Sequence, residues 1–81
     1  MPEDNYGAPL VIVASLKRYV EHKVPTGSFL QAVLENNLKE AFERADDINR
    51  YKMFEIFSYC YNKIPAISWG SPERVKNWLK S

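Results

Sequence analysis

The stretch Val24–Arg44, VPTGSFLQAVLENNLKEAFER, decides the fold. Pro25 and Gly27 interrupt regular structure at its start, and Ser28 with Gln31 has the spacing of a capping box, which satisfies two backbone donors at a helix start. Behind this start, apolar residues recur at steps of three and four and share one helical face: Leu30, Val33, Leu34, Leu38, Ala41, Phe42 and Ala45. The stretch therefore predicts an amphipathic helix that packs in a hydrophobic core.

Asn37 lies inside this apolar face, between Val33 and Ala41. A buried amide without hydrogen-bond partners costs about 1–3 kcal/mol. We therefore expect Asn37 either to be satisfied within the fold or to wait for a ligand.

The segment upstream reads as a second helix, from about Pro9 to His22. Proline is favoured in the first turn of a helix, and an apolar stripe follows it, made of Ile12, Val13, Leu16, Tyr19 and Val20. Because Val11–Val13 are all β-branched, a short strand at Leu10–Ala14 is the alternative.

The segment downstream needs a new helix. Continuing the first apolar face would place Lys52 and Glu55 at its centre, whereas a restart capped by Asp46 or Asp47 avoids this. The restarted stripe is Met53, Phe54, Phe57, Tyr61 and Ile64, which leaves four side chains for water: Lys52, Glu55, Tyr59 and Lys63. We expect a central helix over about 47–63, ended by Pro65.

Ser71, Pro72 and Glu73 give the start signal of a last helix, whose buried face is Val75, Trp78 and Leu79. The predicted fold is all-α, a small bundle of three to four short helices around the central helix. Residues 1–8 are expected to form a flexible arm, and residues 9–81 a single helical domain.

Composition narrows the function. A domain of 81 residues buries only about 60–65% of its unfolded surface, yet 46% of the residues are hydrophobic and 14% aromatic, so we expect a homo-oligomer. The net charge of +1 argues against a long nucleic-acid footprint and leaves room for a small anionic ligand.

The apolar run Leu10–Ala14 is too short to span a membrane. Because Cys60 is the only cysteine and Glu3 and Asp4 stand where a signal peptide needs basic residues, the cytoplasm is expected.

Catalytic and metal chemistry find little support in the residues. With one histidine and one cysteine, no metal site is expected, and we expect no cofactor. His22 reads as a solvated helix end and Cys60 as a small hydrophobic residue, so no nucleophile, base and orienting group can be named together. Thr26–Ser28 could hold an anion on its amides, although helix capping alone explains it.

The candidate binding residues form a polar edge along the first-described helix. Asn36, Asn37 and Arg44, with Arg50 on the next helix, place two guanidinium groups beside an apolar face, an arrangement that suits a carboxylate, a phosphate or an acidic loop. The alternative is an ordinary i,i+4 ion pair between Glu40 and Arg44. Three residues further along complete the candidate set: Tyr61, Trp69 and Ser71. Trp69 either covers the core or serves as an exposed anchor.

Several blocks resemble a family of small, mostly uncharacterised proteins encoded by bacteriophages and prophages. The blocks are PTGSF (25–29), AVLENNL (32–38), RAD (44–46), YN (61–62) and WGSP (69–72), together with YVEH (19–22). The resemblance implies a phage accessory protein in the bacterial cytoplasm and brings no catalytic or binding residues with it. The leading hypothesis is a non-enzymatic protein that binds and modulates a host component, such as a bacterial defence system. The alternatives are an oligomeric sponge for a nucleotide signal and a structural or assembly protein.

Overall fold

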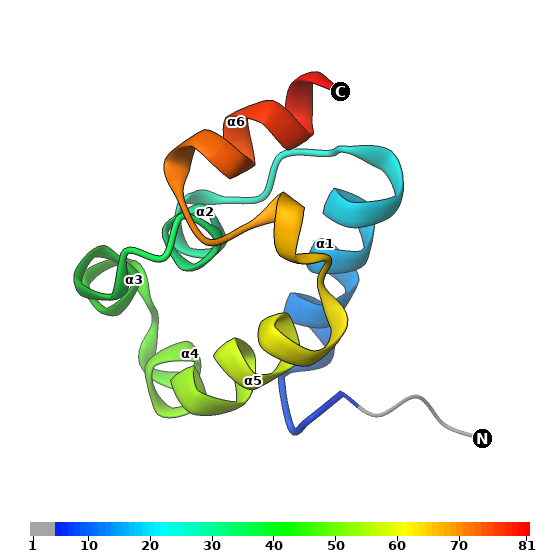
Figure 1. The fold of residues 1–81 in the computed structure, drawn as a ribbon. Helices are drawn as coiled ribbons and strands as arrows, with labels where there is room; N and C mark the ends of the chain where they lie inside the picture. The colour runs from blue at the N-terminus through cyan, green and yellow to red at the C-terminus, as the bar shows by residue number, and fades with distance from the viewer. Residues whose placement is uncertain (1–4) are drawn as a thin grey trace.

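The computed structural model describes residues 5–81, and this part of the chain contains six α-helices, one short 3-10 helix and no strand. The α-helices are α1 (Leu10–His22), α2 (Ser28–Leu34), α3 (Leu38–Arg44), α4 (Asp47–Tyr51), α5 (Met53–Lys63) and α6 (Pro72–Lys80), and the 3-10 helix is η1 (Ala66–Ser68). Viewed as in Figure 1, α6 lies above the core, α2 and α3 to its left, α4 and α5 below it, and α1 to its right. The all-α class is confirmed, with more and shorter helices than the sequence predicted.

The first helix follows the prediction closely. Pro9 is its N-cap and the chain leaves it at Lys23, a left-handed residue with φ 56°. The side chains of its inner face are buried: Ile12, Val13, Leu16 and Tyr19. The alternative strand at Leu10–Ala14 is not adopted.

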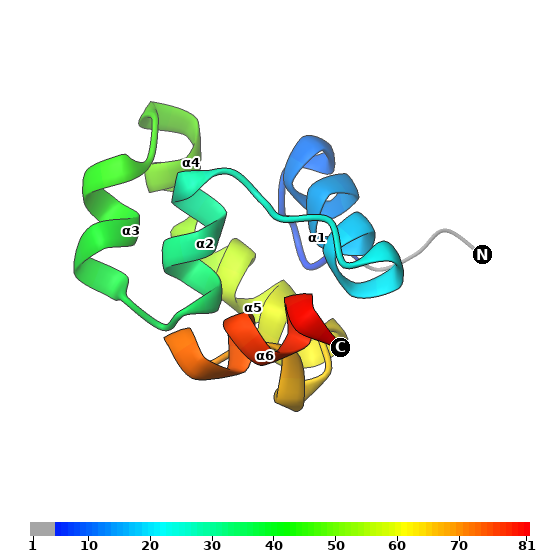
Figure 2. The same ribbon diagram turned by 90° about the horizontal axis from the view of Figure 1, so that it is seen from above.

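The predicted helix over the deciding stretch is broken in two. Asn36 takes a left-handed conformation with φ 61°, and the Oδ1 atom of Asn37 accepts a hydrogen bond from the amide of Glu40 at 3.2 Å, which makes Asn37 the N-cap of α3. Asparagine tolerates both roles better than most residues. Asn37 is exposed, so the expectation of a buried amide was wrong. Because the chain turns at this pair, α2 and α3 lie side by side (Figure 2).

The capping box at the start of the same stretch was also wrong. Gly27 is the N-cap of α2, and no side chain caps this end. Ser28 is already the first helical residue, and the amide of Gln31 instead donates to the carboxylate of Glu35 at 3.1 Å. The spacing of Ser28 and Gln31 therefore predicted the start of the helix to within one residue, but it did not predict the hydrogen bonds that these two side chains make.

The restart at Asp46 is confirmed, because its Oδ1 atom accepts from the amide of Asn49 at 2.7 Å. The helix expected over 47–63 is divided at Lys52 into α4 and α5. Its buried face is also rotated from the prediction and consists of Met53, Ile56, Tyr59, Cys60 and the following residue Ile64. Phe54 and Tyr61, expected in the core, are 80% and 81% exposed, whereas Tyr59, expected in water, is 2% exposed.

Tyr19 joins three parts of the core. Its hydroxyl donates to the carbonyl oxygen of Ser68 in η1 at 2.6 Å, and its own carbonyl oxygen accepts from the Trp78 indole of α6 at 3.0 Å. The predicted start of α6 is confirmed, since the Ser71 hydroxyl accepts from the Arg74 amide at 3.2 Å. These bonds tie the C-terminal third of the chain to α1.

The N-terminal segment was expected to be an arm over residues 1–8. Residues 1–4 lie outside the described part of the chain. From Asn5 the chain makes a tight turn, in which the Ala8 amide donates to the Asn5 carbonyl at 2.9 Å and Ala8 is buried. Gly7 has φ 80°, and a β-carbon there would approach the Glu55 side chain to 3.0 Å, so glycine fits this turn. None of the helices in the described residues is long and apolar enough to cross a membrane.

Candidate functional site

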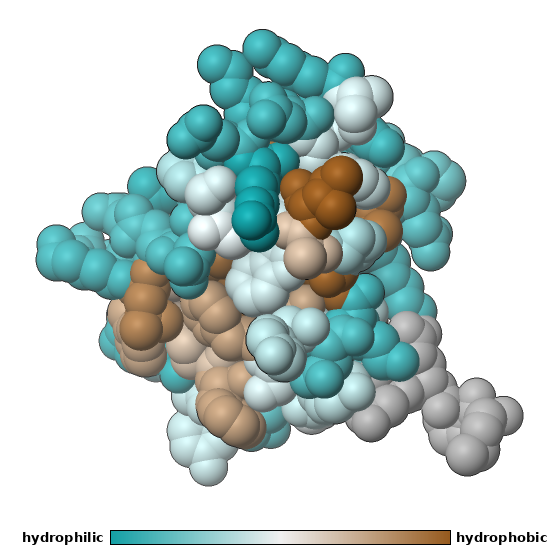
Figure 3. Space-filling model, viewed as in Figure 1, coloured by the Kyte–Doolittle hydropathy of each residue, from teal (hydrophilic) through white to brown (hydrophobic). Residues whose placement is uncertain are grey.

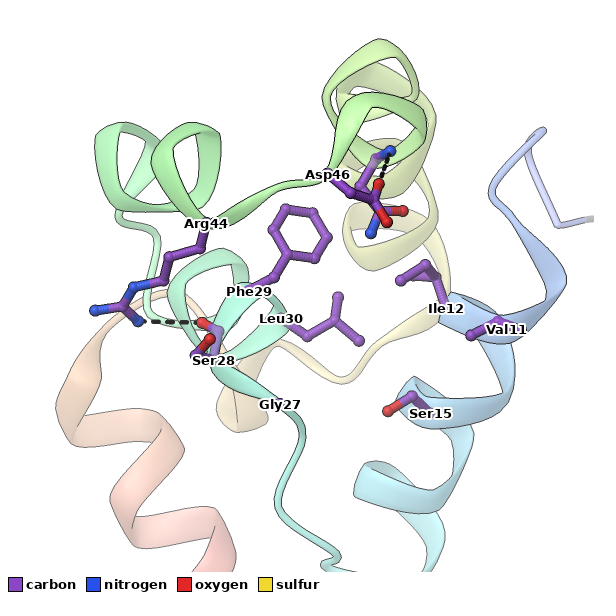
Figure 4. Close-up of a pocket in the computed structure, with 10 residues that line it drawn as sticks. Val11, Ile12, Ser15, Gly27, Ser28, Phe29, Leu30, Arg44 and Asp46 are labelled. Atoms are coloured by element: carbon purple, nitrogen blue, oxygen red, sulfur yellow. Dashed lines mark hydrogen bonds between the residues drawn. The ribbon is translucent and has the colours of Figure 1, made fainter.

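A groove separates α1 from the wall made by the start of α2 and the junction between α3 and α4 (Figure 4). Its volume is about 380 Å³. The lining residues come from three parts of the chain and are Val11, Ile12, Ser15, Gly27, Ser28, Phe29, Leu30, Arg44, Asp46 and Asn49.

The groove continues along the N-terminal end of α1. A neighbouring hollow of about 400 Å³ shares four lining residues with it, and Leu10 and Ile48 join the lining there. The two hollows therefore form one continuous channel between α1 and α4, which we call the α1–α4 groove.

Apolar side chains meet across this groove. In Figure 4, Phe29 and Leu30 of α2 face Ile12 and Val11 of α1. Ile12 and Leu30 are 7% and 4% exposed and make the floor. Three aliphatic side chains stand at its rim and are largely open to water, namely Leu10 at 74%, Val11 at 79% and Ile48 at 67% exposure. Branched aliphatic side chains so exposed and so close together mark an interaction surface more often than isolated ones do.

The polar groups at the rim leave an excess of negative charge. Arg44 pairs with the Glu40 carboxylate at 3.2 Å and donates to the Ser28 carbonyl at 3.1 Å, so its charge is already matched. Figure 4 shows its guanidinium beyond Ser28, away from the apolar centre of the groove. The Asp46 carboxylate lies over the groove and accepts a hydrogen bond from the Asn49 amide, and Asp47 beside it is exposed. Residues 35–55 as a whole carry six acidic against four basic side chains.

The predicted polar edge is not gathered into one pocket. Asn37 and Arg44 lie at opposite ends of α3, roughly 10 Å apart by the helical rise over seven residues. Asn36 forms the turn before Asn37. Arg50 donates to the carbonyl oxygens of Phe42 at 3.4 Å and Ala45 at 3.3 Å, so it caps the end of α3. Of these residues, Arg44 alone borders the groove.

The other predicted site residues are spread over the opposite part of the chain. Tyr61 stands exposed on α5. Trp69 packs against the core, with its ring centre 6.4 Å from that of Phe57. Of the two alternatives given for Trp69, this is the one in which it covers the core. Ser71 caps α6.

Sequence reasoning missed most of the groove, above all Val11, Phe29 and Asn49. Val11 gave a usable signal, because it is an aliphatic residue that lies off the buried stripe of its own helix. Phe29 and Asn49 gave none, since only the folding of α2 and α4 against α1 brings them together.

Titratable groups elsewhere serve the core. Burial raises the pKa of the Cys60 thiol to about 12, and burial, followed by the nearby charge of Glu35, raises the pKa of the Tyr19 hydroxyl to about 12. Both groups are therefore neutral at physiological pH. Within residues 5–81, no group of three or more His, Cys, Asp or Glu side chains is placed to hold a metal ion.

Comparison with known proteins finds no relative: no protein-family model matches the chain, and neither the curated proteins nor the solved structures contain a match.

Proposed function

We propose that this chain is a non-enzymatic accessory protein of a bacteriophage, which binds and modulates a component of the bacterial host cell. The modulation that we favour is inhibition of a bacterial defence system in the host cytoplasm, by a homo-oligomer. The resemblance of the PTGSF, AVLENNL and WGSP blocks to phage-encoded proteins supports the origin. The α1–α4 groove supports the mode of action, and it is the observation that carries the proposal.

The groove suits a protein partner better than a small polar ligand. Its floor is apolar, its rim combines exposed aliphatic side chains with Asp46 and Arg44, and the charge of this arginine is matched by Glu40 and the Ser28 carbonyl. Channels of this kind accept the apolar face of an amphipathic helix, with anchors at i, i+3 or i+4, and i+7. Each aliphatic rim side chain that such a helix covers contributes about 1.5–3 kcal/mol of gross hydrophobic free energy.

Charge selects among such helices. The groove is bordered by Asp46, with Asp47 next to it, and the surrounding segment has an excess of acidic residues. A helix with a lysine or arginine beside its apolar face is therefore attracted, and one with an acidic flank is repelled. The proposed partner is a host protein that presents a basic amphipathic helix.

The test compares matched variants in the capture of a host protein. Val11→Lys places a charge on the rim at a side chain that is 79% exposed, so the fold is expected to survive and capture to be lost. Ile67→Lys is the control, because Ile67 is 69% exposed and lies on η1, outside the groove. The bait is exposed to a nuclease-treated, dialysed bacterial lysate, and any protein retained by the wild type is purified and titrated against each variant by calorimetry. Equal affinity for the wild type and for Val11→Lys would overturn the proposal.

A second variant tests the charge. Asp46→Asn removes the carboxylate while keeping a good N-cap residue for α4. We expect it to slow association with the captured protein at low salt and to have little effect at high salt, where charges are screened.

A different result would favour the hypothesis that the chain binds a nucleotide. A nucleotide that raises the melting temperature of the wild type and not of Arg44→Gln would replace the host-protein proposal, since a specific ligand stabilises by mass action.

A further inference from the structure

Aromatic side chains line the side of α5 that faces away from the core. Phe54 and Tyr61 are 80% and 81% exposed, and Phe57 between them is half-buried. Positions 54, 57 and 61 are spaced i, i+3 and i+7, so these three side chains lie along one side of the helix. We call this row the α5 aromatic face.

The α5 aromatic face is a surface of its own. It shares no residue with the lining of the α1–α4 groove. Its polar positions Ser58 and Asn62 are uncharged, and the Asn62 amide already donates to the Ser58 carbonyl at 2.8 Å. Trp69, packed at the ring of Phe57, widens it. Figure 3 shows apolar surface gathered at the lower left, over the region of α3 to α5.

We propose that a second copy of this chain covers the α5 aromatic face, with the two α5 helices packed antiparallel about a two-fold axis. A two-fold interface must be complementary to itself, and the spacing of the row meets this condition. When the axis passes between Phe57 and Ser58, Phe54 of one copy meets Tyr61 of the partner subunit, and the same pair forms again on the other side. Tyrosine and tryptophan are also the side chains most enriched where interfaces gain their affinity.

The exposed area is that of a weak dimer. A phenylalanine or tyrosine side chain buries about 150–250 Å² when fully covered, so Phe54 and Tyr61, each about four-fifths exposed, offer roughly 250–400 Å² per copy. Two copies therefore bury roughly 500–800 Å² through these side chains alone. The exposed parts of Phe57 and Trp69 raise the total to about 1,000 Å², the size of weak and transient interfaces. This area is typical of a reversible dimer.

Sedimentation equilibrium between about 5 and 200 μM tests the inference on the full chain. We expect a mass that rises with concentration from the 9.4 kDa of one copy toward twice that value. Phe54→Lys and Tyr61→Glu are each expected to raise the dissociation constant about 30-fold, because each change removes the aromatic side chain from both copies, at about fivefold for each. Circular dichroism checks that both variants keep their helices, which their exposure leads us to expect.

The double variant tests the antiparallel register. With Phe54→Lys and Tyr61→Glu in the same chain, the lysine at 54 meets the glutamate at 61 of the partner copy, so dimerisation is expected to recover above either single variant. Val11→Lys, on the groove rim, is the control and is expected to leave the dissociation constant unchanged. A wild type that stays monomeric at every concentration, a double variant no better than the singles, or a dimer lost in Val11→Lys alone would each overturn the inference.

This inference extends the self-association proposed above and is independent of the groove. A dimer that captures no host protein would keep the interface and reject binding through the groove. A monomer that captures a host protein would keep binding through the groove and reject both the interface and the proposed homo-oligomer.

Discussion

Tyr19→Phe removes one buried hydrogen bond and almost nothing else. Tyr19 is 0% exposed, and its hydroxyl donates to the Ser68 carbonyl at 2.6 Å across 49 residues of sequence. The phenylalanine ring keeps the apolar contacts of the tyrosine ring, so the change isolates the hydroxyl.

The expected loss follows from what the substitution leaves behind. Ser68 is itself 0% exposed, so water cannot readily replace the lost donor at its carbonyl. A buried acceptor left without its partner costs about 1–3 kcal/mol. A domain of 81 residues has a total unfolding free energy of roughly 4–12 kcal/mol, so this one hydroxyl is a sizeable share of it.

The assay is urea and thermal unfolding followed by circular dichroism. At about 4–8 °C per kcal/mol for a domain of this size, Tyr19→Phe is expected to melt roughly 5–20 °C below the wild type. Tyr51→Phe is the matched control, because Tyr51 is 84% exposed and its change is expected to stay within about 0.5 kcal/mol. Equal stability of Tyr19→Phe and the wild type would refute the view that this bond anchors η1 to α1.

Three further predictions concern other parts of the fold. Asn37→Ala should cost about 0.5–2 kcal/mol of unfolding free energy, because the N-cap of α3 is lost, and Asn37→Asp should restore most of it; a tolerant alanine variant would show that α3 does not depend on this cap. Ile56→Ala should lower the free energy of unfolding by about 2–5 kcal/mol, because Ile56 is 0% exposed. Phe54→Ala should lower it by less than about 1 kcal/mol when measured at micromolar concentration or below, because Phe54 is 80% exposed. The reverse order in urea titrations would mean that the buried face of α5 is misassigned. The free energy of unfolding should fall as pH rises from about 9 towards 12, because the raised pKa of the Cys60 thiol, about 12 against 9.0 when free, keeps the folded state protonated where the unfolded state has ionised. Cys60→Ala should reduce that fall, and the part that remains above about pH 10 is due to Tyr19, whose pKa is also raised to about 12. An unchanged slope between about pH 9 and 10 would argue against the burial of the thiol.

Local signals in the sequence located most helix ends. Pro9, Asp46 and Ser71 each stand at the start of a helix, and two of them cap it with a side-chain oxygen as their chemistry predicts. Such bonds form within one turn of chain, so they depend on neighbours in the sequence alone. The all-α class and the restart at Asp46 followed from the same short-range rules.

The pair Asn36–Asn37 shows where periodicity misled. The apolar spacing continues across it from Leu34 to Leu38, so the pattern is that of one helix. The break depends on a left-handed Asn36 and a capping Asn37, and it lets α3 fold back beside α2 and bury Ala41, while Leu38 and Phe42, expected on the buried face, are 52% and 40% exposed. The packing gained by folding back is a tertiary quantity, and no window of sequence contains it.

The face of α5 was likewise decided by its neighbours. Apolar and aromatic residues occur around most of this helix, so the sequence offers two similar stripes, one with Phe54 and Tyr61 and one with Ile56 and Cys60. The core selected the second, which left the aromatic residues on the surface.

By itself, then, the sequence determined what short-range bonding can determine, namely the helical class, the capped helix starts and the absence of a disulfide within a chain that has one cysteine. The tertiary structure decided which side of α5 faces water and which distant residues line the α1–α4 groove. The physical reason is that burial depends on surfaces from distant parts of the chain: Val11 and Phe29 are 18 positions apart, and Phe29 and Asp46 are 17. The free energy gained by covering such surfaces exists only once the helices have packed.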